Sequence, residues 1–195
     1  MIEPLKRVAR AVALIAVSPL LLWFLIKRQI MDPDCALQGS AQALSLLPGL
    51  PGMYIRRAFL SVALDRCAPT SVVEFGVTFS RAGARLDDNV YVGSFSNLGL
   101  VHLERDVLIA SGVHIPSGPE THGSDSTDLA IRDQPGHRQL VRVGAGSWVG
   151  SGAIVMADVG RDCIIGAGAV VTHPIPDRSV AVGVPARVVR VRGDS

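Results

Sequence analysis

Cysteine, lysine and net charge are all scarce in this sequence, and each shortage excludes a class of protein. The 195 residues contain three cysteines, Cys35, Cys67 and Cys163, at scattered positions. An odd, scattered set is no disulfide framework and fits a reducing compartment, with each thiol serving as small apolar filler. The sequence has no CxxC or Cys/His cluster of the kind that binds zinc. The formal net charge is +2, so no overall basic field suggests nucleic acid as a partner.

An uncharged apolar run, AVALIAVSPLLLWFLI, occupies residues 11–26. Basic residues flank it, and both lysines of the chain are among them: Lys6, Arg7, Arg10, Lys27 and Arg28. A helix of this length covers about 24 Å, short of a hydrocarbon core of about 30 Å, and snorkelling basic side chains can close the difference. A membrane-spanning anchor, a re-entrant or interfacial helix and a cleaved signal peptide all fit. We predict a retained anchor over residues 1–30, because the run ends in Lys-Arg and the nearest small-x-small site lies far downstream at 41–43.

The next segment, residues 31–70, has the pattern of short amphipathic helices. One helix is expected over 41–47, where a Pro-Gly pair ends the pattern. A second, over 53–64, places its apolar side chains on one face, with Arg56 and Arg57 beside that face. Such a helix can lie at a bilayer surface, or it can pack on the end of the domain that follows. Both interpretations remain open from the sequence.

A six-residue repeat dominates the C-terminal part of the chain. Residues 143–176 read VGAGSW VGSGAI VMAD VGRDCI IGAGAV VTHPIP, with one unit cut to four residues. A period of six is too long for a helical turn and is typical of a parallel β-helix, in which each coil stacks its aliphatic residue on that of the coil below. The aliphatic residues that open the units are Val143, Val149, Val155, Val159, Ile165 and Val171.

A less regular form of the repeat begins near residue 72 and stops at Ile115. We therefore expect a β-helix domain over residues 71–195, interrupted by a loop at 116–142. This loop has no period and is rich in Pro, Gly, Ser and Asp, and a long structureless loop inside a compact domain usually has a function. It contains His122 and His137.

The order of several motifs resembles that of the hexapeptide-repeat acyltransferases. These motifs are LIASGVHIPSG, a following His, VGAGSWVGSGAIV, IGAGAVVT and GVPARVVR. This order is most similar to that of the family's maltose, galactoside and xenobiotic O-acetyltransferase branch, over about residues 72–192. The resemblance implies a mainly β protein, a left-handed parallel β-helix of hexapeptide coils that here follows N-terminal α-helices. It also implies a homotrimer with active sites between subunits, and acetyl transfer from acetyl-CoA to a hydroxyl or amine.

The resemblance also implies a catalytic centre. His122 matches the family's general base, and a neutral imidazole can take the proton of a hydroxyl that attacks a thioester. His137 is the second candidate for this role. Asn97 matches a family Asn that orients the substrate or hydrogen-bonds the acyl intermediate, although Asn also occurs at coil corners for conformational reasons.

Residues of the last coils match positions that contact the cofactor in the family. Ser151, Ala167 and Thr172 correspond to the pantetheine channel, and His173 stands where the family often has Lys. Arg187 and Arg190 correspond to residues near the adenine nucleotide, where a guanidinium suits phosphate; Gly183 and Pro185 predict a fixed turn before them. Trp148 either packs on the cofactor or covers a coil edge.

We therefore expect a membrane-anchored, trimeric, acetyl-CoA-dependent O-acetyltransferase with no metal cofactor. Because acetyl-CoA is cytosolic, the catalytic domain should face the cytoplasm, beside a lipid-linked glycan or a surface polysaccharide in biosynthesis. One alternative is an acetyltransferase for a small soluble acceptor such as an antibiotic, a free sugar or an amino acid. Another is a non-catalytic or carbonic-anhydrase-like β-helix with His102, His122 and His137 around zinc.

Overall fold

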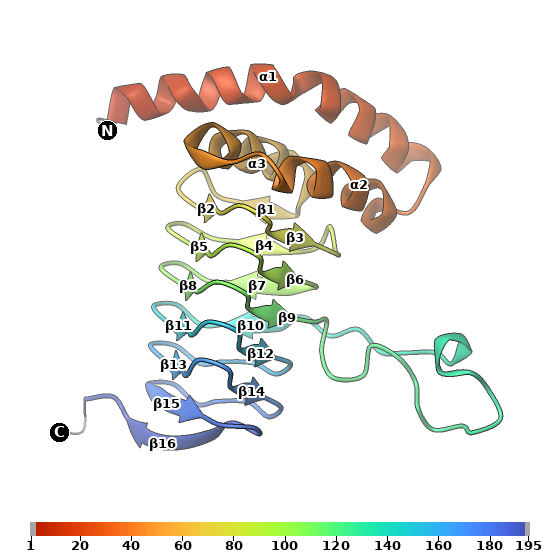
Figure 1. The fold of residues 1–195 in the computed structure, drawn as a ribbon, viewed down its shortest axis with the longest axis vertical. Helices are drawn as coiled ribbons and strands as arrows, with labels where there is room; N and C mark the ends of the chain where they lie inside the picture. The colour runs from red at the N-terminus through yellow and green to blue at the C-terminus, as the bar shows by residue number, and fades with distance from the viewer. Residues whose placement is uncertain (1–2, 194–195) are drawn as a thin grey trace.

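The structure is a computed structural model that describes residues 3–193, and it contains helices followed by a stack of β-coils (Figure 1). Within these residues three α-helices come first: α1 (Glu3–Ile30), α2 (Pro33–Ser45) and α3 (Gly49–Ala63). All later strands belong to the coils except the last, which folds back along its predecessor. The mainly β class, with a parallel β-helix behind N-terminal helices, is confirmed.

The coils place their short strands in three sheets. Sheet A holds β1 (Arg66–Cys67), β4 (Arg85–Leu86), β7 (Val101–Leu103) and β10 (Val141–Val143). Sheet B holds β2 (Val72–Val73), β5 (Tyr91–Val92), β8 (Leu108–Ile109), β11 (Trp148–Val149), β13 (Ile164–Ile165), β15 (Ser179–Val182) and the antiparallel β16 (Arg187–Val191). Sheet C holds β3 (Thr78–Phe79), β6 (Asn97–Leu98), β9 (His114–Ile115), β12 (Ile154–Val155) and β14 (Val170–Val171).

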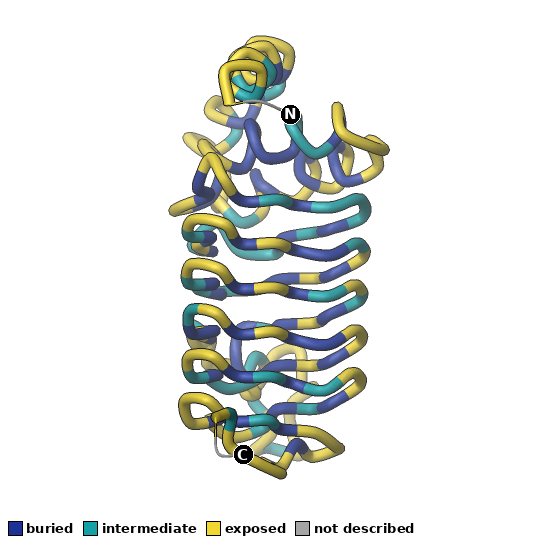
Figure 2. The backbone as a smooth tube through the Cα atoms, turned by 90° about the vertical axis from the view of Figure 1, so that its left-hand side faces the viewer, coloured by how far each residue is buried: buried dark blue, intermediate teal, exposed yellow. Residues whose placement is uncertain are grey.

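Each two-residue strand turns one side chain outward and one into the core, as the alternation along a strand requires. The residues that open the repeat units are the inward ones, so the predicted period is correct (Figure 2). All are buried: Phe79, Leu86, Val92, Leu98, Leu103, Ile109, Ile115, Val143, Val149, Val155, Val159, Ile165 and Val171. The stack starts at Arg66, slightly before the expected residue 71, and it resumes at Val141.

Helices α2 and α3 cover the N-terminal end of the coil stack. Phe59 and Leu60 of α3 are buried against the first coils, so α3 packs on the end of the stack, one of the two alternatives left open by the sequence. Arg56 is buried too: its Nε donates to the carbonyl of Val73 at 3.1 Å and its Nη1 to that of Leu44 at 3.2 Å. The guanidinium thus joins the two helices to the first coil.

Helix α1 is longer than the apolar run and spans about 42 Å. It continues through Pro19, which has no N–H for the carbonyl of Ile15; the Ser18 hydroxyl donates to that carbonyl instead, at 2.8 Å. Figure 1 shows α1 lying across α3, transverse to the stack, and the Phe24 and Phe59 rings meet edge to face at 5.4 Å. In the part of the chain that the structure describes, α1 is the one helix long and apolar enough to cross a membrane.

Two of the cysteines behave as apolar filler. Cys67 and Cys163 are buried, and burial raises the pKa of both thiols. Cys35 is exposed on α2. A raised pKa keeps a thiol protonated and unreactive, so neither buried cysteine has the character of a nucleophile.

Candidate functional site

The outer face of sheet C, called face C below, carries the predicted Asn97. Its outward side chains stand in register on successive coils: Thr78, Asn97, His114, Ile154 and Val170. Asn97 is exposed, and its Nδ2 donates to Thr78 Oγ1 at 2.7 Å. His114 pairs with Asn97 on the next coil and lies two residues before the long loop begins. Face C therefore places Asn97 beside the root of the loop that carries His122.

The loop forms an arm, residues 116–140, that projects from the stack after β9 (Figure 1). Its two limbs lie side by side, since His137 N donates to the Glu120 carbonyl at 2.7 Å and Gln139 N to the Ser117 carbonyl at 2.8 Å. The buried Gln134 side chain closes the tip with hydrogen bonds to the backbone of Ser126 and Leu129; the short 3₁₀ helix η1 (Ile131–Asp133) directly precedes it. The arm is thus an ordered structure with its own hydrogen bonds.

His122 lies on the outgoing limb and is exposed, and His137 is exposed on the returning limb. A Cβ at Gly136 would stand against the Thr121 carbonyl and within 2.7 Å of the His122 nitrogen, so the limbs can approach only where glycine stands. Within residues 3–193 no hydrogen bond links either imidazole to a carboxylate or to Asn97. The structure therefore brings both histidines to one arm but does not bring His122 into contact with Asn97.

Phe95 is a residue of this region that the sequence analysis missed. It is 64% exposed, has a φ of 61°, and its ring meets that of Phe75 edge to face at 5.5 Å. The corresponding corner of the other coils holds glycine with positive φ: Gly76, Gly112, Gly152 and Gly168. A bulky residue in this conformation is strained, and strained residues gather at functional sites. The sequence feature that could have revealed Phe95 is an aromatic residue at the position of the repeat where the other coils have glycine, two positions before Asn97.

The predicted pantetheine residues lie on both edges of face C. Ser151 and Ala167 occupy the same corner of consecutive coils, between sheets B and C, where Gly168 N donates to the Ser151 carbonyl at 2.9 Å. Thr172 and His173 follow β14 at the opposite edge, with Thr172 Oγ1 2.9 Å from His173 Nδ1. The four residues thus flank the apolar pair Ile154 and Val170 and do not form one column.

The C-terminal arginines follow the fixed turn that Gly183 and Pro185 predict. Val170 N donates to the Gly183 carbonyl at 3.0 Å, and Ala186 N donates to the Val170 carbonyl at 2.8 Å. The turn therefore closes the last strand of face C, and Arg187 follows it directly. Arg190 lies further along β16, opposite Val180 of sheet B. Both arginines are exposed.

Trp148 does not lie on face C. It is 48% exposed on the outer face of sheet B, called face B, between Leu108 and Ile164 in register. Tyr91 and Val180 extend this ladder, so face B is an apolar stripe along the stack. Trp148 therefore lies on a different face from Thr172 and His173, whereas Arg190 stands opposite Val180 at the end of the same ladder.

His102 lies on the outer face of sheet A in a polar cluster that the sequence did not reveal. Its Nε2 is 3.0 Å from Asp87 Oδ2, and Arg66 Nε is 2.7 Å from Asp87 Oδ1. The surrounding cleft of about 470 Å³ has equal numbers of basic and acidic residues: Arg66, Arg105, Arg161, Asp87, Asp88 and Glu104. His102 stands in register with Arg142, two residues after the arm ends, and residues 3–193 contain no group of three His, Cys, Asp or Glu side chains arranged for a metal.

Known proteins of similar sequence include acetyltransferases. A probable acetyltransferase of Mycobacterium tuberculosis is 42% identical over 73 residues, 36% of this chain and 24% of that protein. The galactoside O-acetyltransferase of Escherichia coli is 26% identical over 167 residues, 75% of this chain and 82% of the relative. A putative lipopolysaccharide biosynthesis O-acetyl transferase of Escherichia coli is 29% identical over 124 residues, 59% of this chain and 61% of the relative. The chain thus matches about a quarter of the first relative's length and under two thirds of the third's.

Solved structures show the same fold. A galactoside acetyltransferase in complex with coenzyme A has a TM-score of 0.63 at 20% identity and covers 85% of each chain. A hexapeptide-repeat acetyltransferase from Vibrio cholerae, complexed with acetyl coenzyme A, has a TM-score of 0.62 at 18% identity over 82% of this chain and 88% of that one. No family model matches the sequence. In its hexapeptide coils, in the arm that interrupts them and in its sequence, the chain is similar to the hexapeptide-repeat O-acetyltransferases.

Proposed function

We propose that the protein transfers the acetyl group of acetyl-CoA to a hydroxyl of a membrane-associated sugar, either a lipid-linked glycan or a surface polysaccharide. The observation that carries this proposal is the composition of face C. It unites Asn97, the exposed Phe95, the root of the His122 arm and the corners with Ser151 and Ala167 along one side of the stack.

His122 acts as the general base of the reaction. Its imidazole takes the proton of the acceptor hydroxyl while the oxygen attacks the thioester carbonyl. When the tetrahedral intermediate collapses, the C–S bond breaks, and the imidazolium returns the proton to the thiolate of coenzyme A. Backbone N–H groups at a coil edge stabilise the oxyanion. Asn97 orients the substrate, and Phe95 offers an aromatic surface against which a sugar ring can pack.

The active site is completed between the subunits of a homotrimer. Two observations support this assembly. The arm that carries His122 extends away from its own stack, and its histidine has no orienting partner among the described residues (Figure 1). The apolar ladder of face B, with Leu108 and Trp148 both more than 40% exposed, is a surface that a second subunit would cover.

The membrane holds the protein through α1, which we place in the plane of the interface. Its inner face, with Val17 and Phe24, is buried on the other helices. Its remaining surface exposes a second apolar set: Val8, Val12, Ile15, Leu22, Trp23, Ile26 and Ile30. A spanning orientation would separate Phe24 from Phe59 and forfeit about 2–3 kcal/mol of burial for each ring. An in-plane helix keeps that packing, leaves the coils on the cytoplasmic side and puts the outer apolar set into the acyl boundary.

The test is acetyl transfer by the full chain to a panel of lipid-linked and soluble glycans, with His122→Ala and His137→Ala as a matched pair on the same arm. We expect a 10²–10⁴-fold loss of kcat for His122→Ala and a small effect for His137→Ala. The reverse pattern would assign the base to His137, and unchanged turnover in both variants would reject an imidazole base. Equal rates on soluble sugars, free amino acids or antibiotics would favour the soluble-acceptor alternative.

A further inference from the structure

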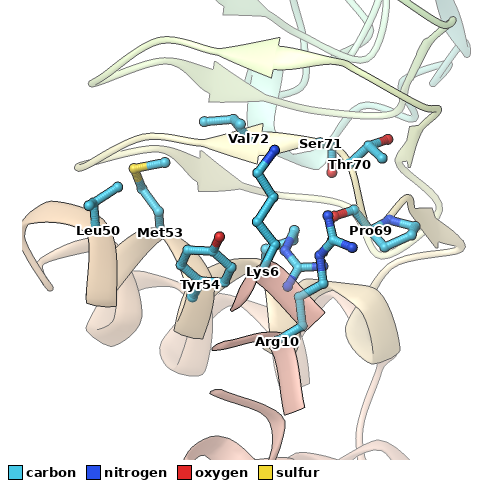
Figure 3. Close-up of a pocket in the computed structure, with 10 residues that line it drawn as sticks. Lys6, Arg10, Leu50, Met53, Tyr54, Pro69, Thr70, Ser71 and Val72 are labelled. Carbon is cyan, nitrogen blue, oxygen red and sulfur yellow. The ribbon is translucent and has the colours of Figure 1, made fainter. Parts of the chain in front are cut away.

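A cleft between α1, α3 and the first coil joins positive charge to apolar surface (Figure 3). Its volume is about 150 Å³. Lys6 and Arg10 enter it from α1, and Arg57 enters from α3. Leu50, Met53 and Tyr54 of α3 form the opposite wall in Figure 3. The cleft lies at the helical end of the molecule, and none of the residues that line it belongs to the arm or to face C.

The charge of this cleft is not balanced by its surroundings. Glu3 is the carboxylate that meets it, 3.0 Å from Arg10 Nη1 and 3.9 Å from Lys6 Nζ, so three cations face one anion. Burial, and then the nearby Arg10, lower the pKa of Arg57, which marks the cost of holding two guanidinium groups close together. Among the described residues, the buried Arg10 Nε has no hydrogen-bond partner. An anion in the cleft would relieve the repulsion and accept from that donor.

The cleft continues into an apolar groove between α1 and α3. Leu50 and Tyr54 line both spaces, so the charged cleft and the groove share a wall. The groove measures about 330 Å³, and its α1 side is formed mainly by small residues, among them Ala9 and Ala16. An anionic group and an apolar chain can therefore be held at the same time, end to end.

We propose that this composite site binds one anionic phospholipid, with the phosphate between Lys6, Arg10 and Arg57 and an acyl chain along the groove. Guanidinium forks and a lysine ammonium are the groups that bind phosphate, and basic clusters beside an apolar helix recognise anionic lipids. Free phosphate would leave the groove unused, and a second copy of this chain would bring its own positive charge. The site does not depend on the proposed acetyl transfer, and its test does not use that activity.

The test counts lipids retained by the full chain after release from a neutral detergent in native mass spectrometry. The probes are phosphatidylglycerol, phosphatidylcholine and inorganic phosphate. Lys6→Gln/Arg10→Gln removes two charges from the cleft, and Arg7→Gln/Arg28→Gln removes two exposed charges from the same helix outside it. Ala16→Trp fills the groove, and Ala11→Trp adds the same ring to an exposed site beyond it. Thermal melting verifies that each variant folds.

We expect one retained phosphatidylglycerol per chain, with phosphatidylcholine and phosphate much weaker. Lys6→Gln/Arg10→Gln should weaken phosphatidylglycerol binding about 30-fold, whereas Arg7→Gln/Arg28→Gln changes it little. Ala16→Trp should weaken phosphatidylglycerol binding about tenfold, because an acyl chain excluded from the groove loses apolar burial worth at least a tenfold change in affinity. Ala11→Trp should leave phosphatidylglycerol binding unchanged. Equal losses in the two charge pairs would reduce the effect to general attraction and overturn the proposal. Equal retention of phosphatidylcholine, or phosphate binding as strong as that of the lipid, would overturn it as well.

Discussion

Asn97 is tied to Thr78 on the preceding coil of face C by the 2.7 Å hydrogen bond from its amide nitrogen to the threonine hydroxyl. With one N–H held by the threonine, the second N–H and the amide oxygen are the groups left to hydrogen-bond a substrate. Thr78 therefore orients Asn97, the candidate substrate contact, and has no proposed contact with the substrate itself.

This relationship predicts a graded pair of variants. Asn97→Ala should lower kcat/KM about 10²-fold, as the loss of a preorganised polar group does. Thr78→Val removes only the hydroxyl that holds the amide, so we expect a loss of about tenfold, with Thr78→Ser restoring activity. Steady-state kinetics with acetyl-CoA and a glycan acceptor give the values. If Thr78→Val lowers activity as much as Asn97→Ala, or Asn97→Ala has no effect, the role assigned to Asn97 is wrong.

Gly136 sets the shape of the arm, because any Cβ there meets the backbone of Thr121 and His122. Gly136→Ala should push the limbs apart and displace His122, and a displacement of about 1 Å can cost about 10²-fold in rate. The melting temperature should change little, since the arm lies outside the coil core. Gly39→Ala on α2, where a Cβ meets nothing within 4 Å, is the control and should leave turnover unchanged. A fully active Gly136→Ala enzyme would show that the arm's geometry does not position the base.

A substitution of Trp148 can show whether this residue packs against a second subunit or against the cofactor. On face B its indole stands between Leu108 and Ile164, so Trp148→Glu places a charge in the middle of the proposed trimer contact. We expect sedimentation to show monomers for Trp148→Glu and trimers for Arg85→Glu, which introduces the same charge on the outer face of sheet A. A trimeric Trp148→Glu variant with weakened coenzyme A binding would return this residue to the cofactor site.

Arg56 is expected to stabilise the junction of helices and coils. Its guanidinium donates to the carbonyls of Val73, Leu44 and Leu47, and methionine in its place removes all three hydrogen bonds, although Leu44 keeps Leu47 N as a donor. At about 1 kcal/mol for each lost partner, Arg56→Met should lower the free energy of unfolding by about 3 kcal/mol. Denaturant unfolding measures the difference, with the exposed Arg85→Met as the control. A variant as stable as the wild type would mean that apolar packing replaces these hydrogen bonds in full.

Much of the site could be predicted only as a set of separate residues. Ser151 and Ala167 share a corner, as their equal place in the repeat indicates, but Thr172 and His173 lie across the face from them. Phe95 and the His102–Asp87 pair escaped notice because neither belongs to a motif: one departs from the glycine corner pattern, and the other joins residues of two different coils. The deep burial of Arg56 escaped because a charged residue beside an apolar helix face normally lies at the surface.

The coil architecture was determined by the sequence alone. The inward aliphatic residues and the corner glycines each favour a particular local backbone geometry. A six-residue period of such residues therefore predicts a stack of coils. The interruption of that period at 116–140 predicts an arm. Only the tertiary structure decided which side chains meet. Face C, face B and the composite cleft each combine residues from separate coils or helices, and their alignment depends on the register of stacking and on the packing of α1 over α3. Those are long-range contacts, which no local pattern of residues encodes.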